Sequence, residues 1–159
     1  MASSRFPNKP MQKICGIPMI GHCYLRSRLS NFLTDVYVAT CDKEIYNYIE
    51  SIGGKAIMTS DTHERASDRT SEALLKIEDM TKQKIDIVVM IQGDEPMLTP
   101  KMIEDAVTPL IENKEIKITN LMGELKSIEE HEDPNEVKVV VDNKSFALYF
   151  SRDPIPSRK

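Results

Sequence analysis

The run Ile85-Asp-Ile-Val-Val-Met-Ile91 is the feature that most narrows the fold of this 159-residue chain. The run is nearly all apolar, whereas a strand with one face in water alternates apolar and polar residues. A strand buried on both faces has such a composition, and such strands belong to parallel sheets that helices cover on both sides. The run therefore predicts an α/β protein in which this segment is a buried strand.

Strand and helix patterns alternate along the rest of the chain, which favours a largely parallel sheet. The further predicted strands are 35–40, 55–58 and 116–122, followed by a hairpin of 137–141 and 146–150 with a turn at 142–143. The predicted helices are 16–29, 42–52, about 70–80, one that begins at 99–100, and an acidic segment, 124–133, that is helical or irregular. The polar stretch 59–69 is predicted to be a loop.

Several helices carry start or stop signals. Asp42 suits an N-cap, and Gly53-Gly54 ends the helix that follows it. Thr99 suits a cap with Pro100 at the first helical position, and Pro109 should kink or end that helix early. The side chains predicted to face the core are Ile20, Cys23, Tyr24 and Leu29 in the first helix, and Ala73, Leu74 and Ile77 in the third.

Composition excludes several classes of protein. The net charge of −4 argues against a nucleic-acid binder, which is usually basic. No apolar run approaches the roughly 18 residues of a membrane span, and no charged-then-apolar leader opens the sequence. The 3 cysteines match no zinc spacing and the 3 histidines are scattered, so we expect reduced thiols in a cytoplasmic protein.

The first ten residues have the composition of a phosphate-binding loop. Ser3 and Ser4 are small and let the backbone approach an anion. Arg5 offers a planar fork to phosphate oxygens, and Lys9 offers a mobile point charge. In α/β nucleotide-binding folds such a loop follows the first strand, and no strand precedes it here. The loop predicts nucleotide chemistry and an incomplete chain.

Gln92-Gly-Asp-Glu-Pro96 follows the predicted buried strand directly. Ligands in open α/β sheets bind at the carboxyl ends of strands, so this segment is suitably placed. Gly93 lets the backbone approach a ligand, and Gln92 suits a base edge or a sugar hydroxyl. Asp94 and Glu95 are hard oxygen donors suited to Mg²⁺. The alternative is a surface turn with two solvated carboxylates.

Two further polar segments follow predicted strands. The segment His63–Thr70 leads into a helix, whose N-terminus Ser67 or Asp68 can cap and whose first turn can bind an anion. Its arginines, Arg65 and Arg69, add charge for phosphate or carboxylate. The segment 149–156 ends a strand with an arginine and two prolines, and its alternative interpretation is a plain exit from strand to loop.

Together these segments resemble one family, the cytidylyltransferases that activate 3-deoxy-manno-octulosonate (Kdo), also called CMP-Kdo synthetases. The matching segments occur in the family's order and span nearly the whole chain. They are Ser4-Arg-Phe-Pro-Asn-Lys-Pro10, Gly16-Ile-Pro-Met-Ile20, Ser67-Asp-Arg69, Gln92-Gly-Asp-Glu-Pro-Met97, Asn135-Glu-Val-Lys-Val-Val140, Ala147-Leu-Tyr-Phe-Ser-Arg152 and Ile155-Pro156. The fourth and sixth are the most specific, because sialic-acid relatives differ at both places.

The resemblance implies a Rossmann-like nucleotidyltransferase fold of three layers with a mostly parallel sheet, in one partial domain over residues 1–159. It implies transfer of CMP from CTP to a 2-keto-3-deoxy sugar acid, with release of pyrophosphate, for lipopolysaccharide biosynthesis. The sugar's anomeric hydroxyl attacks the α-phosphate in line, so the protein mainly positions groups and neutralises charge. The implied cofactor is Mg²⁺, and the implied assembly of the full-length form is a homodimer.

The resemblance also implies roles for individual residues. Arg5 and Lys9 hold the triphosphate and stabilise the leaving pyrophosphate, and Asp94 binds Mg²⁺; these three are the implied catalytic residues. The implied nucleotide-binding residues are Ser3, Ser4, Ser67, Asp68, Arg69, Gln92 and Gly93. The implied sugar-acid residues are Glu95, Tyr149 and Arg152.

The chain departs from the family at both ends. Members begin with an apolar strand ending Ile-Pro-Ala-Arg, and they continue past the last residue here with a second metal-binding aspartate and much of the dimer contact. We therefore expect a truncated chain that is unstable or inactive alone, because losing a strand leaves its neighbours unpaired. Three alternatives stay open: a related substrate such as 8-amino-Kdo, a non-catalytic CTP-binding fragment or subunit, and a plain α/β domain with solvated loops.

Overall fold

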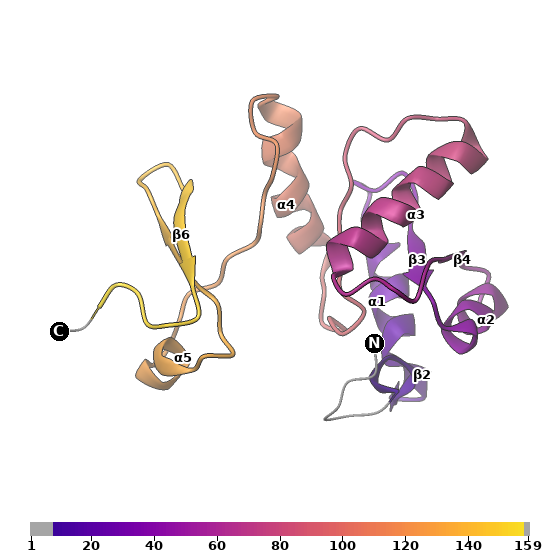
Figure 1. The fold of residues 1–159 in the computed structure, drawn as a ribbon, viewed down its shortest axis with the longest axis horizontal. Coiled ribbons are helices and arrows are strands. Elements are labelled where there is room, and N and C mark those ends of the chain that lie inside the picture. Colours follow the sequence, from indigo (N-terminus) through magenta and orange to yellow (C-terminus); the bar gives the residue numbers. More distant parts are fainter. Residues whose placement is uncertain (1–7, 158–159) are drawn as a thin grey trace. The chain divides into compact units, whose positions relative to one another are not determined.

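A computed structural model describes residues 8–157, which fall into two compact units that meet in the sequence between Thr119 and Asn120 (Figure 1). The first unit contains η1 (Lys9–Met11), β1 (Lys13–Ile14), β2 (Ile17–Pro18), α1 (Met19–Ser27), β3 (Tyr37–Thr40), α2 (Lys43–Ser51), β4 (Lys55–Met58), α3 (Ala66–Thr81) and α4 (Pro100–Glu112). The second contains α5 (Ile128–Glu132), β5 (Lys138–Val141) and β6 (Ala147–Ser151). The expectation of one partial domain over residues 1–159 stays a prediction.

The centre of the first unit is a parallel pair of strands covered by helices on both faces (Figure 1). In β3 and β4, Val38 lies opposite Ala56 and Ala39 lies opposite Ile57, so successive pairs point to opposite faces. One face forms a cluster with α1 and α2, through Ile20, Tyr24 and Ile49. The other face packs on α3, through Ala73 and Ile77. The unit therefore has the helix–sheet–helix layering of an α/β protein.

The predicted helix caps of α2 and α4 are confirmed. The Asp42 carboxylate accepts a hydrogen bond of 2.8 Å from the backbone N–H of Glu44, which would otherwise lack a partner in the first turn. Thr99 Oγ1 accepts one of 3.3 Å from Met102, and Pro100 takes the first helical position. Pro109 ends the helix less early than expected, because α4 continues to Glu112 and places Pro109 in its last turn.

Two predicted strands, 85–91 and 116–122, are wrong, since neither pairs with another strand among the described residues. An apolar run indicates that its side chains would suit a buried strand. A strand also needs a neighbouring strand whose backbone N–H and C=O groups are free to pair with it. β3 and β4 pair with each other, and the run from Ile85 has several exposed side chains, Val88 and Met90 among them. Its first backbone N–H, that of Ile85, donates to the Glu78 carboxylate at 3.0 Å.

The predicted apolar stripe of the first helix is confirmed at its start and wrong at its end. Ile20, Cys23 and Tyr24 are buried on α1. Leu29 keeps 66% of its surface exposed, because α1 ends at Ser27 and the helical spacing that would turn Leu29 inward does not continue. None of the described helices is both long and apolar enough to cross a membrane.

The second unit is built on the predicted hairpin. β5 and β6 pair antiparallel, with Val140 opposite Tyr149. The Asp142 carboxylate fixes the turn by accepting hydrogen bonds of 2.8 Å from the N–H groups of Lys144 and Phe146. An aspartate that binds the backbone two residues on is a frequent turn-former, so this turn could be expected from the sequence.

Lys138, at the start of β5, is the most deeply buried charge described in the second unit, with 2% of its surface exposed. Its ammonium donates to the carbonyl oxygens of Asp133, Glu136 and Arg152, the last two at 2.9 and 2.8 Å. An ammonium has three N–H donors, so these three acceptors satisfy it completely. A buried charge is tolerated when its hydrogen bonds are complete, and here they join the loop before β5 to the end of β6.

Candidate active site

Lys9 and Asp94, two residues singled out from the sequence, meet in the first unit. Lys9 Nζ lies 2.8 Å from Asp94 Oδ2, and the two side chains keep 37% and 41% of their surface exposed. Lys9 opens η1, and Asp94 lies in the loop that precedes α4. The sequence-predicted residues Ser3, Ser4 and Arg5 lie outside the described residues. The pair places one cation and one carboxylate at an accessible point of the surface.

The loop Gln92–Leu98 carries Asp94 and consists of two successive turns. The N–H of Glu95 donates to the Gln92 carbonyl at 3.3 Å, and the N–H of Leu98 donates to the Glu95 carbonyl at 3.2 Å. The Gln92, Asp94 and Glu95 side chains are exposed, as ligand-binding groups must be. The loop backbone is therefore held by its own turn hydrogen bonds, and its polar side chains point to solvent.

Helix α1 packs against this loop. A Cβ at Gly93 would lie 2.9 Å from Ile20 Cδ1, so a glycine here allows the close approach. Arg26 Nε donates to the Leu98 carbonyl at 2.5 Å. Burial raises the pKa of the Cys23 thiol; the N–H of Glu95, directed at the sulfur, opposes that effect, and the Asp94 and Glu95 charges add to it. The loop thus contacts α1 near its start, at Gly93, and at its end, at Leu98.

Sequence reasoning missed the contact between Arg26 and the loop, and it gave Cys23 a role in the core alone. The available signal was the spacing of Ile20, Cys23 and Arg26, which recur every three residues and so share one helix face. Nothing in the spacing indicates what that face covers, because the loop lies more than 60 residues further along the chain; the Arg26–Leu98 bond spans 72 positions.

The start of α3 differs from the prediction that Ser67 or Asp68 is its cap. The N-cap is Arg65, whose side chain makes no capping hydrogen bond, and the helix begins at Ala66. Ser67 and Asp68 therefore lie within the first turn, where both are exposed. The helix starts earlier than expected because Ala66 is already helical, whereas Arg65 before it is extended. Asp68 still suits this position, since a carboxylate is favoured near a helix N-terminus.

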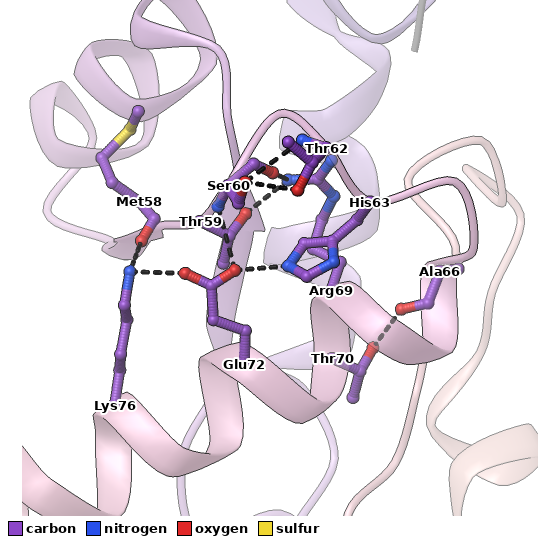
Figure 2. Close-up of polar contacts among 10 residues, drawn as sticks. All are labelled: Met58, Thr59, Ser60, Thr62, His63, Ala66, Arg69, Thr70, Glu72 and Lys76. Carbon is purple, nitrogen blue, oxygen red and sulfur yellow. Dashed lines mark hydrogen bonds and ion pairs between the residues drawn. The ribbon is translucent and has the colours of Figure 1, made fainter.

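Arg69, predicted to bind nucleotide, turns back onto the loop between β4 and α3 (Figure 2). Its Nη1 atom donates to Thr59 Oγ1 and, at 3.0 Å, to the carbonyl of Ser60. These bonds join the second turn of α3 to the residues that leave β4. Arg69 therefore braces the loop from inside, whereas Ser67 and Asp68 face solvent.

Glu72 holds the same loop from one turn further along α3, a role that sequence reasoning missed (Figure 2). Its carboxylate accepts hydrogen bonds from the N–H of Ser60, at 2.9 Å, and from His63 Nε2. Lys76 Nζ lies 2.6 Å from its other oxygen. Lys76 first, then the Ser60 N–H and His63, lower the pKa of Glu72 from its ordinary 4.5 to about 2. The spacing of Glu72 and Lys76 is the usual helical ion-pair spacing, but the loop contacts leave no mark in the sequence.

The remaining predicted residues, Tyr149 and Arg152, lie at the end of the second unit's hairpin. Tyr149 is exposed on β6. Arg152 Nη1 donates to the carbonyl oxygens of Pro134 and Asn135 at 2.9 and 3.4 Å. The Arg152 carbonyl in turn accepts from Lys138. Arg152 is thus held at both its backbone and its side chain against the loop before β5.

The exposed carboxylate of Asp94 suits a magnesium ion that takes its other ligands from water and from a substrate. Among the described residues no three His, Cys, Asp or Glu side chains gather in a metal-binding group. Magnesium sites often use one or two carboxylates and complete the shell with water and substrate phosphates. An exposed aspartate beside an exposed lysine fits that kind of site and does not fit a closed structural metal site.

Residues 1–159 match the sequence model of the cytidylyltransferase family. The chain belongs to this family, an assignment that agrees with its layered α/β architecture and with the ion pair beside the Gln92–Leu98 loop. A 3-deoxy-manno-octulosonate cytidylyltransferase of Geobacter metallireducens is 40% identical over 156 residues, which cover 98% of this chain and 59% of the relative. An 8-amino-3,8-dideoxy-manno-octulosonate cytidylyltransferase of Shewanella pealeana is 44% identical, over 97% of this chain and 62% of the relative.

A solved structure of CMP:2-keto-3-deoxy-manno-octonic acid synthetase complexed with CTP has a similar fold. It aligns with a TM-score of 0.82 and 37% identity, covering 99% of this chain and 62% of that one. The predicted α/β nucleotidyltransferase fold is thereby confirmed. The chain spans about three fifths of the length of these relatives.

Proposed function

We propose that this chain carries the nucleotide-binding part of a CTP-dependent cytidylyltransferase that activates Kdo for lipopolysaccharide biosynthesis. The observation that carries the proposal is the Lys9–Asp94 pair, 2.8 Å apart in a chain of the cytidylyltransferase family. The relatives named above act on Kdo or its 8-amino form, and the solved relative holds CTP. A cation and a carboxylate side by side are what a metal-bound triphosphate needs.

In the proposed reaction the anomeric hydroxyl of the sugar acid forms a bond to the α-phosphorus of CTP. The bond to the β-phosphate bridging oxygen breaks, pyrophosphate leaves, and the hydroxyl proton passes to solvent. Lys9, together with Arg5 from the preceding segment, neutralises the charge that develops on the leaving pyrophosphate. Lys9 is suited to this because its ammonium is a mobile point charge that can exchange the Asp94 carboxylate for a phosphate.

Asp94 is the proposed magnesium ligand of this chain, with Glu95 directed to the substrate. A bound magnesium ion would supply charge neutralisation across the phosphates and favour ionisation of the attacking hydroxyl. Asp94 and Glu95 are exposed and lie in a closed double turn, so both carboxylates are presented to solvent. Gln92 and Gly93 of the same turn, with Ser3, Ser4, Ser67 and Asp68, are proposed nucleotide contacts. Arg69 is proposed to act through the loop that it braces.

The proposed sugar-acid residues of the second unit are Tyr149 and Arg152. The held guanidinium of Arg152 suits a carboxylate, because a planar fork binds two oxygens at once. Similarity to both Kdo and 8-amino-Kdo enzymes favours an eight-carbon 2-keto-3-deoxy acid, with Kdo first. A cytoplasmic location and a homodimer of the full-length form complete the proposal.

Calorimetric titration with CTP and Mg²⁺ tests the nucleotide-binding part. Asp94→Asn should weaken binding of CTP with Mg²⁺ by about tenfold or more, as expected for the loss of a charged ligand. Asp86→Asn is the matched control, because Asp86 is an exposed carboxylate that precedes the loop. Equal affinity of the two variants would overturn the assignment of Asp94.

A pyrophosphate-release assay over a panel of sugar acids tests the catalytic part. Release with Kdo supports the proposal, and faster release with the 8-amino form favours the related substrate. Retained CTP binding without release from any acid supports a CTP-binding subunit, the second candidate.

A further inference from the structure

One face of α1 contacts the Asp94 loop at three successive points. Ile20 lies against Gly93, Cys23 faces the N–H of Glu95, and Arg26 binds the carbonyl of Leu98. The three helix residues are three positions apart and so lie on one face of α1. Their partners follow one another in the same order along the loop. The contacts begin at the first turn of the loop and end at its last residue.

The same helix also supports Lys9. The N–H of Met19, the first residue of α1, donates to the carbonyl of Gln12 just after η1, at 2.8 Å. Met11 of η1 packs against the apolar cluster that contains Ile20 and Tyr24. Both partners of the ion pair therefore reach their position through α1, although no residue of α1 belongs to the pair.

Arg26 makes the strongest of the loop contacts. Its Nε lies 2.5 Å from the Leu98 carbonyl, and a charged donor makes a stronger hydrogen bond than a neutral one. Leu98 is the residue before the Thr99 cap, so this bond fixes the junction between the loop and α4. Cys23, one turn before Arg26, is buried, with 4% of its surface exposed.

We propose that Arg26 is a positioning residue of the active site, with Cys23 in a supporting part: together they fix the Gln92–Leu98 loop so that Asp94 faces Lys9. The inference rests on the proposed function, because Arg26 matters to the reaction only if Asp94 binds magnesium and the triphosphate. Arg26 acts through a backbone carbonyl, so it holds the loop and touches no reacting atom.

Arg26→Met tests the proposal, with Arg28→Met as the matched control. Arg28 lies near the same helix end, but its guanidinium sits over the Tyr24 ring, 5.9 Å from the centroid, and not on the loop. Hydrogen exchange reads the loop directly and needs no activity. Arg26→Met should speed exchange of the Gly93–Leu98 amides by about fivefold or more, the effect of one charged hydrogen bond, while Arg28→Met should not.

Magnesium dependence supplies the readout that a purely structural role would not move. In Arg26→Met the Mg²⁺ concentration for half-maximal CTP binding should rise by about five- to tenfold, while CTP affinity in a chelator changes less than twofold. Arg26→Lys, which keeps a charged donor, should restore part of the difference. A uniform loss of CTP affinity with and without Mg²⁺ would mean that Arg26 has no positioning role.

Failure of this inference and failure of the proposed function give different results. Unchanged loop exchange in a folded Arg26→Met chain overturns the positioning role, whatever the chain binds. Faster loop exchange in Arg26→Met, in a chain that binds no CTP, would show that α1 holds the loop and would overturn the proposed function. Gly93→Ala, whose Cβ would lie 2.9 Å from Ile20 Cδ1, disturbs the same contact between α1 and the loop and serves if Arg26→Met does not fold. It should speed exchange of the loop amides, and no change there overturns the proposal.

Discussion

The ammonium of Lys9 lies 2.8 Å from the carboxylate of Asp94, although 85 positions separate the two residues in the chain. Each residue comes from a short polar segment at the edge of the first unit's core. An exposed pair of this kind contributes little to stability, because solvent screens the attraction. Its place in the fold is therefore better explained by a charged ligand than by folding.

A double-mutant cycle on Lys9→Met and Asp94→Asn should give a coupling free energy below about 1 kcal/mol, the range of exposed ion pairs. CTP binding should respond far more strongly, with Lys9→Met weakening it about tenfold or more because a charge-assisted bond to phosphate is lost. Chemical denaturation and calorimetry measure the two quantities. Lys13→Met, a nearby exposed lysine on β1, is the control, and an equal loss of CTP affinity there would contradict the prediction.

Replacing Glu72 should change how stability depends on pH. The Glu72 carboxylate has a pKa of about 2 in the folded chain, below its ordinary 4.5, so its stabilising effect is full above about pH 4.5 and is lost as the pH falls towards 2. Glu72→Gln lacks this effect at every pH. The difference in melting temperature between wild type and variant should therefore be largest near neutral pH and shrink between pH 4.5 and 2.

Thermal unfolding followed by circular dichroism across this range measures the difference. Glu64→Gln removes a carboxylate from the same loop, but at an exposed position, and controls for the loss of one negative charge. A difference between wild type and Glu72→Gln that stays constant down to pH 2 would show that the contacts with Lys76, Ser60 and His63 do not stabilise the charged form.

Lys138→Met should destabilise the second unit by about 1 to 3 kcal/mol, because buried carbonyl groups lose their donor. A two-stranded hairpin is marginal by itself, so the effect should appear as faster hydrogen exchange in β5 and β6. Lys144→Met, in the hairpin turn, is the matched control. Unchanged exchange at Val139–Val141 in the Lys138 variant would refute the structural role of this lysine.

Asp42→Ala should cost about 1 kcal/mol, since it leaves the Glu44 N–H of α2 without its acceptor. Asp42→Asn keeps an oxygen at the same place and should recover most of that loss. Urea unfolding of the three proteins measures both effects. Equal destabilisation by alanine and asparagine would indicate that charge, and not the hydrogen bond, is what matters at this cap.

Local signals made much of the first unit predictable. β4 was expected at 55–58 and lies there, and the caps at Asp42 and Thr99 mark where α2 and α4 begin. These features depend on side chains and backbone groups a few residues apart. The run 85–91 shows the opposite case: its apolar composition is that of a buried strand, but pairing depends on a neighbour that composition does not specify.

The sequence indicated which residues belong to the candidate site better than it indicated which contacts hold them in place. Lys9 and Asp94 were singled out from their residue types and their loops; their ion pair, which the sequence did not indicate, places them side by side. Glu72 and Arg26 were missed because each acts on backbone groups of a distant segment. Such contacts leave no periodic or compositional trace, and Arg69, expected at the nucleotide, proves to be tied to Ser60 for the same reason.

The enclosed ammonium of Lys138 gives the chain a built-in chemical reporter. Amine-reactive labels attack unprotonated, accessible lysines, and this amine has all three N–H groups engaged behind 2% exposure. Exposed lysines such as Lys144 should be labelled at once. The rate at which mass spectrometry finds a label on Lys138 would therefore time the opening of the second unit around this residue, without any substitution in the chain.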